Sequence, residues 1–158
     1  MRRHTCTRRR GFSLLEVVIV VAIIAILAAI GIPRMSRGAR GASDAALTGD
    51  LATLRNAIDL YAAEHTGVYP TATDINTQLV QYTNIAGAVN ATKTTTHIYG
   101  PYMRSIPPLP VGAKKGSTTI AAADANGVGW IYSATPGTIK ANTTDSEKDE
   151  AGKQYNAY

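Results

Sequence analysis

The chain has 158 residues, enough for one modest domain plus an anchor, and a formal net charge of +5. The excess charge lies in the first eleven residues, which hold five of the 16 basic residues and no acid. This leaves 11 basic against 11 acidic residues beyond them. Phosphate binding depends on net positive surface, so this balance argues against a nucleic-acid-binding domain.

The only cysteine, Cys6, lies in the same basic leader, so no disulfide framework within the chain is expected.

An apolar segment follows the basic start. The run 17–30 contains only Val, Ile, Ala and Leu, and residues 12–32 would form a helix of roughly 30 Å, the thickness of a bilayer core. The arginines precede this span, so the positive-inside rule places the N-terminus in the cytoplasm. Three kinds of segment fit this pattern: a cleaved secretory signal, a twin-arginine signal built on Arg9 and Arg10, and a prepilin-type leader.

Glu16 separates these alternatives. A carboxylate near the start of a membrane helix costs about 2–3 kcal/mol unless it finds a partner, and neither kind of export signal uses one. The stretch 10–16 (Arg-Gly-Phe-Ser-Leu-Leu-Glu) resembles the processing motif of type IV pilins and type II secretion pseudopilins. The resemblance implies that a membrane peptidase cuts between Gly11 and Phe12 and methylates the new amine of Phe12. Glu16 then becomes the fifth mature residue and Pro33 the twenty-second, as in that family.

The cut has a physical consequence for Glu16. It creates a cationic amine at Phe12, and in a low-dielectric medium an ion pair is strongly favoured over an unpaired carboxylate. The two residues are an i,i+4 pair and can meet within one helix. The resemblance implies a second kind of pairing, in which Glu16 of an incoming subunit meets the Phe12 amine of its neighbour in a helical filament.

Beyond the span, the helix is expected to loosen and then recover. Pro33 removes one helical hydrogen bond and nearby glycines weaken the helix further, so we expect a flexible or locally melted segment over 31–41. A helix is predicted from about 42 to 65, with a stop at Gly67. Its apolar stripe consists of Leu47, Leu51, Leu54, Ile58 and Tyr61.

The remaining residues predict a small head rich in loops. Asp74 is placed to cap a short helix that runs to about Gln81. Prolines between 101 and 110 exclude a helix there and argue against a central strand. Three short strands with tight turns then predict an antiparallel meander. The strands cover residues 118–122, 128–133 and 138–142. The expected apolar contacts with the helix stripe or neighbouring loops come from Trp130, Tyr132 and Ile139.

The head also resembles a known family. The order of 68–71 (Val-Tyr-Pro-Thr), 100–102 (Gly-Pro-Tyr), a proline-rich stretch and 129–132 (Gly-Trp-Ile-Tyr) is similar to the major pseudopilin of type II secretion. Residues 107–112 depart from it, since they lack the acidic residue and the tryptophan that the family often shows there.

The expected fold class is α+β, with a long N-terminal helix packed on a small antiparallel β-meander of about three strands. The helix has a membrane half and an amphipathic half. Four parts are expected along the chain: a cleaved basic leader over 1–11, a transmembrane and assembly helix over 12–33, an amphipathic extension over 34–66, and a head with a connecting αβ-loop and a sheet over 67–158.

The resemblance also implies a calcium ion in the last loop of the head. Calcium prefers carboxylates and backbone carbonyls, and Asp145 and Asp149 are its expected ligands in the acidic tail; the alternative is a solvated polar tail. No other cofactor and no enzymatic activity are expected. His4, His65 and His97 have no metal-ligand spacing, and no nucleophile motif or phosphate-binding loop is present. We expect His65 to be a solvent-exposed residue at the helix end.

The expected function is a structural subunit of a type II secretion pseudopilus, which polymerises through its N-terminal helix and supports protein export. The expected partners are other copies in a helical filament, minor pseudopilins, the prepilin peptidase, an inner-membrane assembly platform and the membrane, with no nucleic acid. The expected location is the bacterial inner membrane, single-pass, with the head in the periplasm until the subunit enters a periplasmic or surface filament.

Two other functions remain open at this point. One is a major or minor pilin of a surface type IV pilus. The other belongs to a different class: a secreted or tethered module that binds surfaces or sugars through Tyr99, Tyr102 and Trp130.

Overall fold

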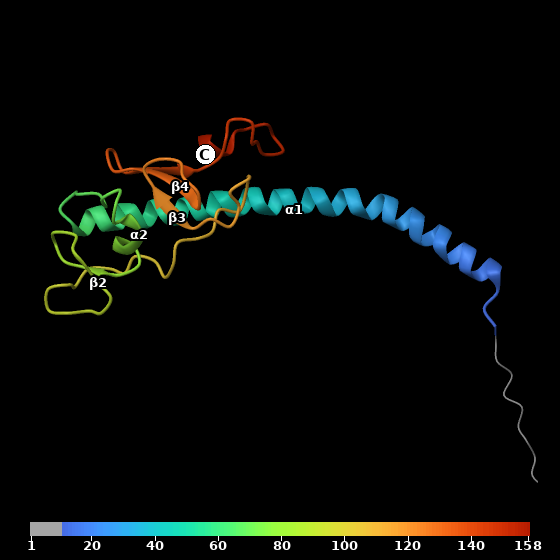
Figure 1. The fold of residues 1–158 in the computed structure, drawn as a ribbon, viewed down its shortest axis with the longest axis horizontal. Coiled ribbons are helices and arrows are strands. Elements are labelled where there is room, and N and C mark those ends of the chain that lie inside the picture. Colours follow the sequence, from blue (N-terminus) through green and yellow to red (C-terminus); the bar gives the residue numbers. More distant parts are fainter. Residues whose placement is uncertain (1–10) are drawn as a thin grey trace, which may run out of the picture. The chain divides into compact units, whose positions relative to one another are not determined.

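The computed structural model describes residues 11–158, apart from the side chains of residues 31–37. The chain divides into two compact units, Met1–Ala39 and Arg40–Tyr158. Helix α1 (Leu14–Glu64) contributes to both units, and the second unit is the head, which holds all the other elements (Figure 1). The expected α+β fold class is confirmed.

Helix α1 is continuous across the region where loosening was expected. It is assigned as one helix of 51 residues, so the prediction of a melted segment over 31–41 is wrong for this structure. A proline inside a helix removes a single donor, and the hydrogen bonds on either side of it can persist at the cost of that one bond. The side chain of Pro33 itself lies outside the described residues.

The apolar stripe of α1 forms one side of the head's core. All five of its side chains are at most 2% exposed, which confirms the predicted face of the helix. The predicted Trp130, Tyr132 and Ile139 belong to the same cluster and are also buried, at most 3% exposed. Full burial of one such side chain stabilises a fold by about 1.5–3 kcal/mol, so this interface is the main source of stability in the head.

A three-stranded sheet packs on the stripe in the order β3-β4-β5. Its strands are β3 (Thr119–Ala121), β4 (Val128–Ser133) and β5 (Thr138–Ala141). The β4–β5 pair is antiparallel, as predicted, with Trp130 opposite Ala141 and Tyr132 opposite Ile139. Alternate residues of β4 therefore point into the core.

The β3–β4 pair is parallel, so the expected all-antiparallel meander is wrong and the sheet is mixed. The turn-like residues 122–127 do not close a tight hairpin. Instead they return the chain to the end of the sheet from which β3 started. Asp124 fastens this connection, because its carboxylate accepts a hydrogen bond from Asn142 Nδ2 at 2.9 Å and pairs with Lys114.

Three short elements complete the head. Strands β1 (Tyr82–Thr83) and β2 (Val89–Asn90) form an antiparallel pair that the sequence did not predict. Helix α2 (Ile75–Gln78) is shorter than predicted, and Asp74 does not cap it through its side chain. That carboxylate accepts hydrogen bonds from the hydroxyls of Thr71 and Thr73 instead. A 3-10 turn, η1 (Tyr155–Ala157), lies near the C-terminus.

The turn that follows α1 contains a residue in a costly backbone conformation. Thr66 has a φ of 57°, in the left-handed region, and Gly67 N donates to Ala62 O at 2.8 Å in a helix-ending turn. A β-branched residue at such a position costs about 1 kcal/mol relative to glycine. Thr66 is exposed, so no side-chain packing offsets this cost.

Replacing Thr66 by glycine is therefore expected to stabilise the head by about 0.5–1 kcal/mol. The measurement is urea unfolding followed by the fluorescence of Trp130, the only tryptophan. Ala63→Gly is the matched control, because it places glycine inside the same helix and is expected to destabilise by about 1 kcal/mol. Equal destabilisation by both substitutions would contradict the proposed strain.

Candidate processing and assembly site

The predicted cleavage bond lies in exposed backbone just before α1. Residues 11–13 have no regular secondary structure, and α1 begins at Leu14. The Phe12 side chain is 84% exposed, and no atom of another part of the chain lies within 4 Å of a Cβ placed on Gly11. Backbone that is exposed and outside a helix is the form in which a peptide bond is accessible to a protease.

Glu16 lies in the first turn of the helix that follows. Its backbone N–H donates to Ser13 O at 3.0 Å, and an acidic side chain in this turn is favoured by the helix dipole. The structure therefore places Gly11, Phe12 and Glu16 together in one short exposed segment. In this uncut chain the nitrogen of Phe12 is an amide, so it has no charge to pair with Glu16.

The helix beyond Glu16 exposes apolar side chains on every side. All large apolar side chains from Phe12 to Ile30 are uncovered in the single chain, from 49% exposed at Val17 to 84% at Phe12. An α-helix that is apolar all round is characteristic of a helix buried in an assembly or in lipid.

Within the part of the chain that the structure describes, no helix is long and apolar enough to cross a membrane. The predicted transmembrane span therefore stays a prediction, as does the assembly role assigned to Pro33.

The two predicted calcium ligands face protein donors instead of one another. Asp145 accepts a hydrogen bond from Asn156 Nδ2 at 2.7 Å, and Asp149 accepts one from Lys153 N at 2.8 Å and one from the Tyr158 hydroxyl. Among residues 11–30 and 38–158, no three Asp, Glu, His or Cys side chains are grouped as metal ligands. A calcium ion would have to displace these donors, so the donor set does not fit a preformed site. Calcium binding stays a prediction.

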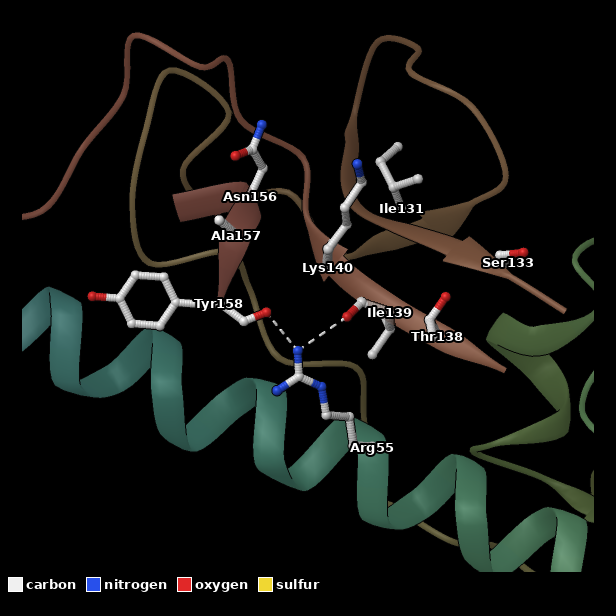
Figure 2. A pocket seen from close by; sticks show the side chains of 9 residues that line it. All are labelled: Arg55, Ile131, Ser133, Thr138, Ile139, Lys140, Asn156, Ala157 and Tyr158. Carbon is white, nitrogen blue, oxygen red and sulfur yellow. Dashed lines mark hydrogen bonds between the residues drawn. The ribbon is translucent and has the colours of Figure 1, made fainter. Parts of the chain in front are cut away.

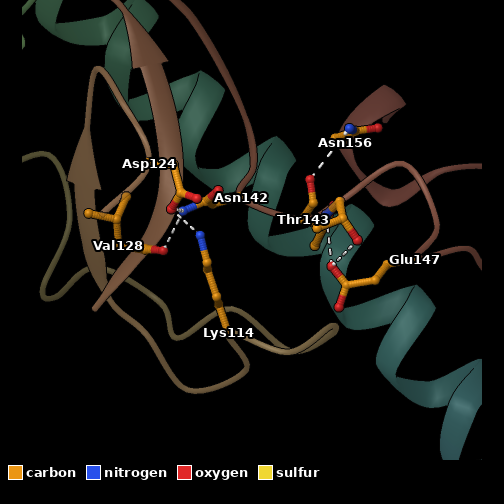
Figure 3. A network of polar contacts seen from close by, with 8 residues as sticks. Lys114, Asp124, Val128, Asn142, Thr143, Glu147 and Asn156 are labelled. Carbon is orange, nitrogen blue, oxygen red and sulfur yellow. Dashed lines mark hydrogen bonds and ion pairs between the residues drawn. The ribbon is translucent and has the colours of Figure 1, made fainter. Parts of the chain in front are cut away.

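Glu147, between these two residues, organises the loop instead (Figure 3). Its carboxylate accepts hydrogen bonds from Thr144 N at 2.8 Å and from Ala113 N, which joins the C-terminal loop to the loop before β3. Sequence reasoning missed this role, although the Thr144-x-x-Glu147 spacing is that of a capping box. The backbone hydrogen bond from Thr144, aided by the one from Ala113, lowers the pKa of Glu147.

His65 is buried, so the prediction of a solvent-exposed histidine is wrong. It is 1% exposed and its ring stacks on Tyr61 with 3.8 Å between centroids. Its Nδ1 lies 2.8 Å from Tyr61 O, and its Nε2 lies 3.0 Å from Asn84 O and 3.1 Å from the Thr83 hydroxyl. The ring thus joins the end of α1 to β1 and has no free nitrogen for a metal.

The residues suggested for a surface-binding module do not form a binding face. Trp130 is fully buried, and its Nε1 donates to Pro107 O at 2.9 Å, which contradicts a role in ligand contact. Tyr102 donates its hydroxyl to Glu64 at 2.7 Å, and burial together with this bond raises the pKa of Tyr102. Tyr99 is half-buried, and its ring centroid lies 5.1 Å from that of buried His65, so it too packs against the head.

A pocket of about 380 Å³ lies between α1, β5 and the C-terminal residues. Figure 2 shows Arg55 reaching from α1 toward the backbone oxygens of two other segments. The guanidinium donates to Tyr158 O at 2.7 Å and to Ile139 O at 3.4 Å. Arg55 therefore fastens the C-terminal residues to the helix and is not a free cation for a ligand.

Comparison with known proteins bears on the N-terminal segment. Residues 6–32 match the prokaryotic N-terminal methylation motif, which is a prepilin signal of the type IV pilin-like kind. The match includes Gly11, Phe12 and Glu16 and ends before Pro33. No curated protein and no solved structure matches the chain. The motif is typical of pilin-like and pseudopilin-like proteins in general and does not distinguish between them.

The role of Glu147 predicts a pH dependence of stability. Its pKa in the folded chain lies below the ordinary value of 4.5, so its contribution is present above pH 4.5 and is lost as the pH falls through the folded value. Glu147→Gln is expected to destabilise the head by about 1 kcal/mol at pH 7, after allowance for solvent screening, and by less at pH 3.

Glu150→Gln is the matched control, because Glu150 is exposed and makes no hydrogen bond in the described part of the chain. Its unfolding midpoint should follow that of the unchanged protein at both pH values. A Glu147→Gln defect of the same size at pH 3 would show that the carboxylate charge is not responsible.

Proposed function

We propose that the chain is a structural subunit of a type II secretion pseudopilus, cut between Gly11 and Phe12 and polymerised through α1. One observation carries the proposal: the helix that directly follows the processing motif is apolar on every side and uncovered in the single chain. Burying one large apolar side chain is worth about 1.5–3 kcal/mol, so this surface favours either lipid or the same helix of other copies. The membrane would hold the subunit until assembly.

The head supports a pseudopilin more than a surface pilin. Its order of motifs resembles the major pseudopilin, and the chain beyond Cys6 contains no cysteine pair of the kind that closes the head of many surface pilins. The uncovered helix also favours an assembly subunit over the tethered binding module, whose proposed contact residue Trp130 is buried. The proposed partners are further copies, minor pseudopilins, the prepilin peptidase and an inner-membrane platform.

The proposed assembly step depends on Glu16. A carboxylate that enters an apolar bundle needs a partner, and the amine freed at Phe12 of a neighbouring subunit supplies one. The helices then pack by apolar contact, while the ion pair sets the register between subunits. The heads lie outside the bundle.

Processing is tested at the residue before the cut. Gly11→Val is expected to block cleavage, because a branched side chain restricts the backbone that must enter the peptidase. The readout is the mature N-terminus by mass spectrometry, with N-methyl-Phe12 expected for the unchanged chain. Gly49→Ala is the matched control, since a Cβ at Gly49 meets no atom within 4 Å. A mature start after residue 28 would overturn the proposal.

Assembly is tested at Glu16. Glu16→Gln removes one charge-assisted pair of about 1.5–3 kcal/mol, so filament yield is expected to fall roughly ten- to a hundredfold while cleavage continues. Asp59→Asn is the matched control, because it neutralises an exposed acid in the same helix. Filament pull-down and the fraction of exported enzyme retained in the periplasm are the two readouts. Loss of surface fibres with normal enzyme secretion would favour a surface pilus instead.

A further inference from the structure

Two tripeptides in the head have the sequence of an N-linked glycosylation acceptor. They are Asn90-Ala91-Thr92 and Asn142-Thr143-Thr144. The pattern Asn-x-Thr is an acceptor only where the asparagine is accessible on an exported domain. The two asparagines have different surroundings in the folded head, and these surroundings decide which of them can react.

Asn142 is closed to modification. It is 6% exposed and lies at the end of β5, where its Nδ2 donates to Val128 O at 2.8 Å and to Asp124 Oδ1 at 2.9 Å (Figure 3). Both hydrogens of the amide are therefore engaged inside the head. Attaching a sugar to this nitrogen would break the connection between β3 and β4.

Asn90 is half-buried, but it lies directly before an exposed loop. It ends the short edge strand β2, and residues 91–96 that follow it are all exposed; in Figure 1 this loop projects from the head. Its Oδ1 accepts hydrogen bonds from Thr92 N at 3.0 Å and Thr92 Oγ1 at 3.3 Å. A backbone N–H can only donate, so this contact identifies the oxygen and leaves Nδ2 as the other amide atom. Within the described residues, that nitrogen donates no hydrogen bond.

This local geometry suits the chemistry of an acceptor. The Asx turn holds the carboxamide in one orientation, with the Thr92 hydroxyl bonded to its oxygen. The nucleophilic nitrogen is unengaged and adjoins an exposed loop of small polar residues. A sugar attached there would adjoin the exposed residues 91–96, and the hydrogen bonds of β2 to β1 use the backbone only.

We propose that Asn90 is a glycosylation site that takes an N-linked sugar once the head has left the cytoplasm. The inference rests on the proposed function for that export. In the transfer, Nδ2 attacks the anomeric carbon of an oligosaccharide carried on a polyprenyl diphosphate. A C–N bond forms, the C–O bond to the phosphate breaks with its electron pair, and one amide proton passes to a base of the transferase. No oxidant or reductant takes part.

The test uses the full chain, purified from membranes of the cells that naturally express it, digested and analysed by mass spectrometry. A sugar mass is expected on the peptide that contains Asn90 and none on the tryptic peptide 141–148. Asn90→Gln and Thr92→Ala are expected to reduce the modified fraction to background, while Thr92→Ser retains it. Asn126→Gln is the matched control, because Asn126 is exposed and lies outside any Asn-x-Thr tripeptide, and it leaves the modified fraction unchanged.

The N-terminus, read in the same digest, separates this proposal from the proposed function. An unmodified Asn90 together with N-methyl-Phe12 would overturn the glycosylation site and leave the function standing. An unmodified Asn90 together with an uncut leader would overturn both. Sugar that persists in Asn90→Gln, or that is found on peptide 141–148, would overturn the assignment to Asn90.

Discussion

Burial of the α1 stripe against the mixed sheet is the interaction on which the head depends. The stripe side chains are closed off by Trp130 and Tyr132 of β4 and by Ile139 of β5. The N-terminal half of α1 has no such cover, although its side chains are at least as apolar. The two halves of one helix therefore differ in how their apolar side chains are covered. The apolar side chains of its second half are buried within the chain, and those of its first half are left uncovered in the single chain.

The sequence predicted the parts of the fold that periodicity and local pattern encode. The stripe of α1 repeats at intervals of four and three residues, which only one helix face can satisfy. Adding His65, four residues after Tyr61, continues that series, so the pattern itself placed His65 on the buried face. The residue type predicted the opposite, an exposed side chain, because histidine is more often exposed than buried. In the structure the ring is buried, and burial is tolerated because both ring nitrogens have a hydrogen-bond partner.

The features that the sequence did not predict depend on contacts between distant segments. Strands β1 and β2 have two residues each, too short for any periodic signal. The connection from β3 to β4 is held by contacts of Asp124 with Lys114 and Asn142, which are ten and eighteen residues away. At the N-terminus the situation is reversed. There the processing segment is local, and a short motif containing Gly11, Phe12 and Glu16 is sufficient to indicate it.

On the proposed function, the same electrostatics determine the order of events. Before the cut, the Phe12 nitrogen is an uncharged amide, and among the described residues it is the helix N-terminus that offsets the charge of Glu16. An unpaired carboxylate in an apolar bundle costs about 3–5 kcal/mol, so an uncut subunit cannot enter the filament readily. The cut removes the five leader arginines and supplies a cationic amine next to the helix. Cleavage therefore precedes assembly because it supplies the partner that Glu16 requires.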